Sequence, residues 1–150
     1  MYPLKLYGDI DMTEDCLFCK IISGKIPSNK VYEDDAVLAF LDIYPASEGH
    51  TLVAPKKHFS KFTDMNAENV ALLFEVARKI TAAVEKASLA EGSNIGINNG
   101  EAAGQEIPHV HVHVIPRRKG DGGRGIKSIV WTESDTTNLE AVAEKIRRAL

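Results

Sequence analysis

The residues best suited to catalysis or ligand binding are three histidines at positions 109, 111 and 113, which alternate with valines. Alternation with β-branched residues predicts a strand, so the three imidazoles would share one face, about 6.5–7 Å apart, with the valines packed into a core behind them. Histidine is the one side chain whose ordinary pKa lets it act as base, acid, nucleophile or metal ligand near neutral pH. A row of three imidazoles therefore indicates a site of chemistry.

Four interpretations fit this row: a polar strand face, a catalytic metal site, a phosphate site with a histidine nucleophile, and a non-catalytic nucleotide-binding site. A His-x-His strand can present two ligands to zinc, copper or iron. A histidine nucleophile instead needs donors around the phosphoryl oxygens, because charge stabilisation dominates phosphoryl transfer. His111 has an imidazole on each side, and Gly104 and Gln105 place amide donors shortly before the strand. These surroundings suit an oxyanion better than a metal.

The chain has two cysteines, Cys16 and Cys19, spaced as Cys-x-x-Cys. In a cytosolic protein this spacing indicates a metal site or a redox pair rather than a structural disulfide. No thioredoxin-like βαβ pattern surrounds the pair, which weakens the redox alternative.

Length and composition indicate one soluble domain, at 16–150, preceded by a loose extension at 1–15. The chain has 150 residues and a formal net charge of −3, which argues against a nucleic-acid-binding protein. No apolar run approaches the roughly 20 residues of a membrane span, and the amino terminus lacks a hydrophobic signal core. We therefore expect a cytoplasmic protein with no membrane partner.

The elements that must position these residues follow from hydrophobic periodicity. Apolar residues at three- and four-residue intervals predict one long helix at 66–90. A capping box starting at Thr137 predicts a terminal helix that buries Leu139, Val142 and Ile146. Strands are predicted at 31–33, 37–42, 50–54, 94–98, 109–115 and 129–132. Together these elements predict an α+β fold built on an antiparallel sheet.

The run 109–115 matches the His-φ-His-φ-His-φ-φ motif of the histidine-triad (HIT) family of nucleotidyl hydrolases and transferases, where φ is hydrophobic. The resemblance extends over residues 16–118 and includes the Cys-x-x-Cys segment, the run 39–43, the run 50–58 and the Gly104-Gln105 pair. It implies the HIT-like fold: an antiparallel sheet of about five strands, one long helix and short flanking helices.

The resemblance implies that His111 attacks the α-phosphorus of a purine nucleotide and forms a nucleotidyl-histidine intermediate, which water then releases as a nucleoside monophosphate. It also implies further contacts with the substrate: the phosphate with His113 and Gln105, the ribose and base with Asp42 and Ile43, and the phosphate and leaving group with Asn98. The family often has serine where this chain has Glu106. Because a carboxylate repels phosphate, we expect Glu106 to point away and to contribute only its backbone amide.

Zinc-bearing members of the family combine the two cysteines with the histidine of a His-x-x-Val-x-Pro segment and the first triad histidine. By resemblance these are Cys16, Cys19, His50 and His109, a set suited to a closed tetrahedral structural zinc. No organic cofactor is implied. His58 follows two lysines and is expected to be exposed and structural.

Two branches of the family remain open. The cysteine-bearing front half resembles the nucleoside phosphoramidase (Hint-like) branch, whereas the run 114–117 resembles the branch that cleaves dinucleoside polyphosphates. We favour the first; a polyphosphate hydrolase and a non-catalytic nucleotide-binding scaffold are the alternatives. The basic loop residues Arg117, Arg118, Lys119 and Arg124 are either solvated or in contact with a leaving polyphosphate or second nucleotide. The resemblance also implies a homodimer, formed through the helix at 66–90 and the strand at 93–98.

Overall fold

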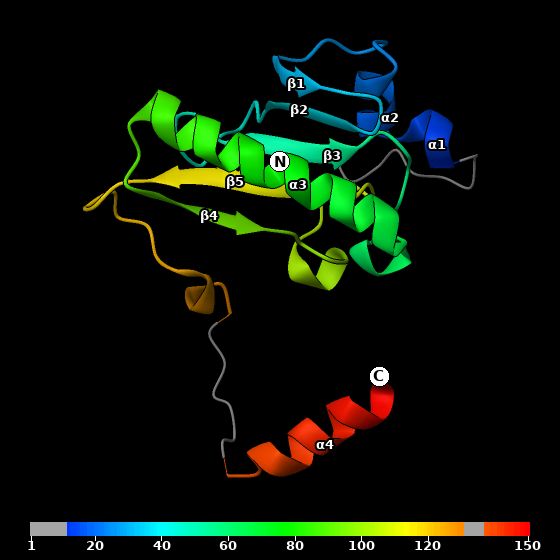
Figure 1. The fold of residues 1–150 in the computed structure, drawn as a ribbon, viewed down its shortest axis with the longest axis vertical. Coiled ribbons are helices and arrows are strands. Elements are labelled where there is room, and N and C mark those ends of the chain that lie inside the picture. The colour runs from blue at the N-terminus through cyan, green and yellow to red at the C-terminus, as the bar shows by residue number, and fades with distance from the viewer. Residues whose placement is uncertain (1–11, 131–136) are drawn as a thin grey trace.

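Five antiparallel strands form one sheet in the spatial order β1-β2-β3-β5-β4 (Figure 1). The computed structural model describes residues 12–130 and 137–150. The strands are β1 (Lys30–Glu33), β2 (Val37–Leu41), β3 (Thr51–Pro55), β4 (Gly92–Gly96) and β5 (Val112–Arg117). The helices are α1 (Met12–Asp15), α2 (Leu17–Ile22), α3 (Ala67–Ser88) and α4 (Leu139–Ala149), with 3-10 turns at Phe62–Asp64, Glu101–Ala103 and Ile126–Ser128. The α+β antiparallel fold predicted from the sequence is confirmed.

The long helix α3 covers one face of the sheet (Figure 1). Its buried side chains, including Leu73 and Val76, pack with the valines at 110, 112 and 114. These three valines are each at most 1% exposed. The prediction that the valines of the triad form a core is therefore confirmed, and the alternation turns His111 and His113 to the opposite face.

The short helix α2 covers that opposite face near the start of β5. Phe18 and Ile21 of α2 are buried against Leu38 and Phe40 of β2. Phe18 also contacts the ring of His111, with ring centroids 4.9 Å apart and edge-on geometry. One aromatic residue thus links the amino-terminal helix to the central histidine.

The triad segment differs from the regular strand expected at 109–115, because β5 begins only at Val112. The backbone amide of His109 donates to the carbonyl of Ile107, and that of Val110 donates to the carbonyl of Phe59. These bonds turn the chain before the ladder with β3 starts. The three imidazoles therefore do not form an even row, and His109 lies in a separate environment from the other two.

The boundaries of α3 lie close to the expected 66–90. Asn66 caps its amino terminus by accepting a hydrogen bond from the amide of Asn69, 2.9 Å away. Leu89 ends the helix in the left-handed conformation at φ 53°, so the last helical residue is Ser88, four residues before Gly92.

The carboxyl-terminal region departs furthest from the sequence-based expectation. In α4, Leu139, Val142 and Ile146 are 64%, 47% and 59% exposed, so the prediction that they are buried is wrong. The predicted strand at 129–132 does not form at 129–130, which follow a 3-10 turn, and 131–132 lie outside the described residues. At the other end, 12–15 form α1, while 1–11 of the expected extension are also outside them. Within the described ranges, no helix is long and apolar enough to cross a membrane.

Candidate active site and metal site

Two cysteines and two histidines converge at the base of the triad segment. The Sγ atoms of Cys16 and Cys19 lie 3.5 and 3.6 Å from Nδ1 of His109. The Nδ1 atom of His58 lies 3.4 Å from the Sγ atom of Cys19 and 3.2 Å from Nδ1 of His109. All four ligand atoms lie within 4.8 Å of one another.

This spacing fits a tetrahedral zinc ion. Zinc bonds of about 2.3 Å to sulfur and 2.0–2.1 Å to nitrogen place neighbouring ligands about 3.5 Å apart for S···N and about 3.3 Å apart for N···N. The ring of His109 is already oriented, because its Nε2–H donates to the carbonyl of Pro55 at 2.8 Å and leaves Nδ1 as a lone pair. Without a cation, burial and the adjacent Cys16 thiol raise the pKa of Cys19 to about 12. The donor set is therefore suited to a metal that stabilises thiolates.

His58 occupies the position in this group that the sequence assigned to His50. The predictions that His50 is the fourth ligand and that His58 is exposed and structural are both wrong in this structure. His50 precedes β3 and His58 follows it, so the strand separates them. Since β3 and β5 are antiparallel, with Val53 opposite Val112, the segment before β5 lies beside the end of β3. His109 consequently meets His58, and His50 lies further along β5, where its Nε2 atom is 2.9 Å from Nδ1 of His113.

The orientation of His111 is that required of a nucleophile. Its Nδ1–H donates to the backbone carbonyl of His109 at 2.7 Å, so Nε2 carries the free lone pair. The side chain is 7% exposed, and burial lowers its pKa to about 4. The ring is therefore neutral at physiological pH, with one nitrogen available to attack an electrophile.

A chain of hydrogen bonds fixes the tautomer of His113. The amide of Ala46 donates to Nδ1 of His50 at 3.1 Å, so His50 carries its proton on Nε2. That Nε2–H donates to Nδ1 of His113 at 2.9 Å, which leaves the proton of His113 on its own Nε2. Burial lowers the pKa of both rings. Nε2 of His113 is buried and has no hydrogen-bond partner among the described residues, so it can donate to a ligand.

His111 and His113 line a cavity of about 250 Å³, and their ring centroids lie 4.9 Å apart. Asp42 lines the same cavity, and its Oδ2 atom lies 3.7 Å from Nδ1 of His50. The other residues of the lining are Phe18, Tyr44, His50, Leu52, Asn98, Gly104, Glu106 and Ile107. The structure thus brings together His111, His113, Asp42 and Asn98 from the sequence-based set.

Glu106 lies closer to the chemistry than expected. It lines this cavity, and its negative charge acts to raise the pKa of His111 against the larger effect of burial. The sequence predicted that only its backbone amide would contribute.

Gln105 and Ile43 are not among the residues that line this cavity. The Nε2 atom of Gln105 donates to the carbonyls of Ser60 and Ile107 at 2.7 and 3.0 Å, and its Oε1 atom accepts from the amide of Gly100 at 2.8 Å. Both N–H groups of this side-chain amide thus bond within the protein and order the loop, and the phosphate contact of Gln105 stays a prediction. Ile43 is 64% exposed, outside the cavity.

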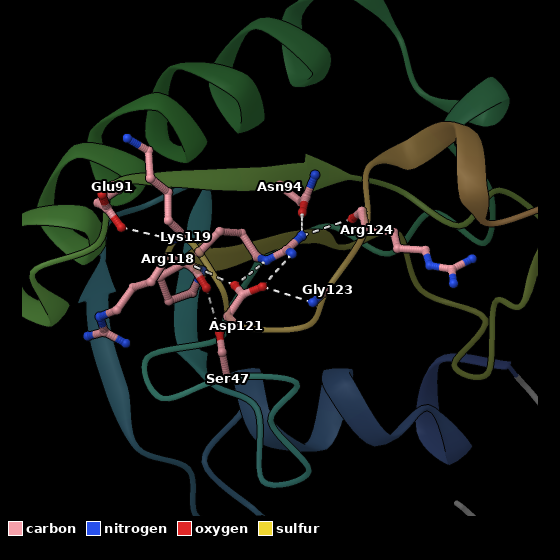
Figure 2. Close-up of polar contacts among 10 residues, drawn as sticks. Ser47, Glu91, Asn94, Arg118, Lys119, Asp121, Gly123 and Arg124 are labelled. Carbon is pink, nitrogen blue, oxygen red and sulfur yellow. Dashed lines mark hydrogen bonds and ion pairs between the residues drawn. The ribbon is translucent and has the colours of Figure 1, made fainter.

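The basic loop is organised around Arg117. Its Nε and Nη2 atoms donate to the carboxylate of Asp121 at 2.7 and 2.8 Å, and Nη1 donates to Asn94 and to the carbonyl of Arg124. Figure 2 shows the carboxylate of Asp121 at the centre of these contacts, where it also accepts from the amide of Gly123. The guanidinium of Arg117 thus orders its own loop rather than facing the cavity of His111.

We expect the substitution Arg117→Met to leave kcat/KM for a nucleoside phosphoramidate within a factor of about two of wild type. The same change should speed trypsin cleavage after Lys119, because the loop loses its central ion pair. Steady-state kinetics and timed proteolysis measure the two effects. Arg124→Met is the matched control, since only the backbone carbonyl of Arg124 takes part in this network. A large loss of turnover in Arg117→Met alone would contradict the structural role.

The antiparallel sheet, the three histidines and the adjoining cysteine–histidine group define a histidine-triad protein. A family model described as HIT domain matches residues 23–120. The chain therefore belongs to the HIT family.

Individual relatives agree with this assignment. A crystal structure from Streptococcus mutans is 49% identical, with a TM-score of 0.81 over 90% of this chain and 85% of that one. A zinc-bound histidine triad family protein from Mycobacterium smegmatis is 37% identical, with a TM-score of 0.70 over 92% and 99% of the two chains. An adenosine 5'-monophosphoramidase of Schizosaccharomyces pombe is 41% identical over 74% of this chain and 80% of its own. The zinc-bound relative and the cysteine–histidine group support the zinc-bearing branch.

Proposed function

We propose that the protein hydrolyses or transfers purine nucleotides of the phosphoramidate type through a nucleotidyl-histidine intermediate. The observation that carries this proposal is the bare Nε2 atom of His111 beside the unpartnered Nε2–H donor of His113, in one cavity. A lone pair and a proton donor side by side are what attack on a charged phosphoryl centre requires.

The reaction has two steps. In the first, the Nε2 lone pair of His111 bonds to the α-phosphorus, and the phosphorus–nitrogen bond of the substrate breaks. The leaving amine keeps the electron pair of that bond and takes up a proton from solvent, to which the second step returns one. In the second step, a water oxygen bonds to phosphorus and releases a proton, and the bond to Nε2 breaks. The products are the amine, a nucleoside monophosphate and neutral His111.

Each surrounding side chain contacts a different part of the substrate. His113 donates from Nε2 to a phosphoryl oxygen, and Asp42 accepts from the ribose hydroxyls. Ile43 flanks the base from outside the cavity, and Asn98 lies near the phosphate and leaving group. Gln105 acts indirectly, because its amide holds the loop that follows Asn98.

We further propose that Cys16, Cys19, His58 and His109 hold a structural zinc ion. Bound there, the ion would crosslink the start of α2, the segment after β3 and the start of the triad segment, and its role would be structural. The close match of the S···N and N···N distances to a tetrahedral site supports this.

A homodimer is proposed from exposed apolar residues on the two elements that the family uses. Leu72 and Phe74 on α3 are 43% and 39% exposed, and Ile95 on the edge strand β4 is 42% exposed. Sedimentation velocity should give twice the mass of one chain.

The test of the proposed activity is the release of AMP from adenosine 5'-phosphoramidate and from diadenosine tetraphosphate by the wild-type protein. We expect a higher kcat/KM for the phosphoramidate. A higher kcat/KM for the polyphosphate would instead indicate a dinucleoside polyphosphate hydrolase. Nucleotide binding without turnover of either compound would indicate a non-catalytic scaffold.

A further inference from the structure

The cavity that holds His111 and His113 is acidic. Two carboxylates line it, those of Asp42 and Glu106, and no lysine or arginine does so among the described residues. The imidazoles do not offset this charge, because His50 and His113 share one hydrogen bond in which each ring is neutral. A substrate entering this space meets an excess of negative charge.

The backbone around Glu106 is held in place by its neighbours. On one side, the Gln105 side chain bonds to the carbonyls of Ser60 and Ile107. On the other, Ile107 is 3% exposed in the core beneath α2. Because both neighbours are fixed, the backbone of Glu106 is held at the cavity that this exposed residue lines, and its charge reaches His111.

The Glu106 carboxylate has no hydrogen bond or ion pair of its own within 12–130 and 137–150. The basic loop does not supply one among the described residues, since Arg117 is paired with Asp121 and no residue of 117–125 lines the cavity. The two acidic residues also differ in position. Asp42 accepts from the amide of Tyr44 beside β2, whereas Glu106 belongs to the loop before β5, together with Gly104.

We propose that Glu106 is a specificity-determining residue that makes the site prefer leaving amines bearing a second, protonated amino group. This inference rests on the proposed phosphoramidate activity and names its substrate class. A cationic group on the leaving amine gains an attractive interaction with the unpaired carboxylate, and a leaving polyphosphate is repelled by it. Alkyl ammonium groups remain protonated at neutral pH, so the discrimination persists under physiological conditions.

The test compares two adenosine phosphoramidates of nearly equal shape, one made with 1,3-diaminopropane and one with n-butylamine. They differ in an ammonium group against a methyl group at the end of the leaving amine. The ratio of kcat/KM for the cationic over the neutral compound is measured for wild type and for Glu106→Gln. We expect the ratio to fall by about fivefold in the variant, the effect of one partly exposed ion pair. Intrinsic differences in reactivity between the two compounds cancel in this comparison.

Glu101→Gln is the matched control, because Glu101 lies in the same loop but not among the residues lining the cavity. It should keep the wild-type ratio. Added salt should lower the wild-type ratio toward that of Glu106→Gln. Glu106→Gln should also raise kcat/KM for diadenosine tetraphosphate.

The outcomes separate the two proposals. If wild type cleaves both phosphoramidates and Glu106→Gln keeps the wild-type ratio, the specificity role is overturned and the activity stands. If wild type cleaves neither compound, the proposed function itself fails.

Discussion

The substitution His111→Ala is expected to lower kcat for adenosine 5'-phosphoramidate by about 10⁴-fold or more, because it removes the nucleophile. No other imidazole can replace it in the described site. Nε2 of His113 carries a proton, and the free nitrogen of His109 faces the two thiols. The size of the loss distinguishes a nucleophile from a residue that only contacts phosphate.

The measurement combines steady-state kinetics with a single-turnover experiment on substrate labelled at the α-phosphorus. Wild-type protein quenched in alkali should retain label on His111, and the variant should retain none. His111→Gln accompanies the alanine variant, since Phe18 packs against this ring and the smaller side chain leaves a gap. Thermal unfolding of both variants shows whether the fold persists. Label trapped on another residue of wild type would overturn the mechanism.

The second large effect concerns the cysteine–histidine group. Cys16→Ser and His58→Ala should each lose bound zinc and lower the thermal midpoint by about 10 °C or more, because the binding energy of a structural zinc is also folding energy. His50→Ala is the matched control: it should keep the metal and lose turnover, since His50 orients His113. Metal content by elemental analysis, thermal unfolding and kinetics are measured on the same preparations.

The two histidine variants should therefore differ in metal content, with zinc lost from His58→Ala and kept by His50→Ala. Loss of zinc in His50→Ala with retention in His58→Ala would restore the ligand set expected from the sequence. Dialysis of wild type against a strong chelator should reproduce the lowered midpoint of Cys16→Ser.

The sequence did not predict correctly which of His50 and His58 lies beside the two cysteines. Both residues flank the same strand, and residue type and spacing do not say which one meets the cysteines. The answer depends on the antiparallel register of β3 and β5, a long-range contact that local patterns do not encode. Had that pairing been assumed, the position of His109 opposite the end of β3 would have favoured His58.

Local patterns succeeded where one face of an element decides its structure. The valines at 112 and 114 and the apolar stripe of α3 were predicted as core because burial alone sets their periodicity. The start of β5 was not predicted correctly, because the backbone amide of Val110 donates to the carbonyl of Phe59, which belongs to no strand. The apolar stripe of α4 has the same pattern as a core helix, yet its residues stay exposed in the single chain.

The loop closed by Gln105 has a thermodynamic consequence for ligand recognition. Gly100 and Gly104 adopt positive φ values of 91° and 84°, and the Gln105 side chain then bonds across the loop. Ordering a flexible loop costs roughly 1–2 kcal/mol for each residue whose backbone becomes fixed. Here the loop is already ordered in the folded protein, so binding of the proposed nucleotide beside His111 does not have to order it. Calorimetric titration should accordingly show a smaller unfavourable binding entropy than a mobile phosphate loop would give.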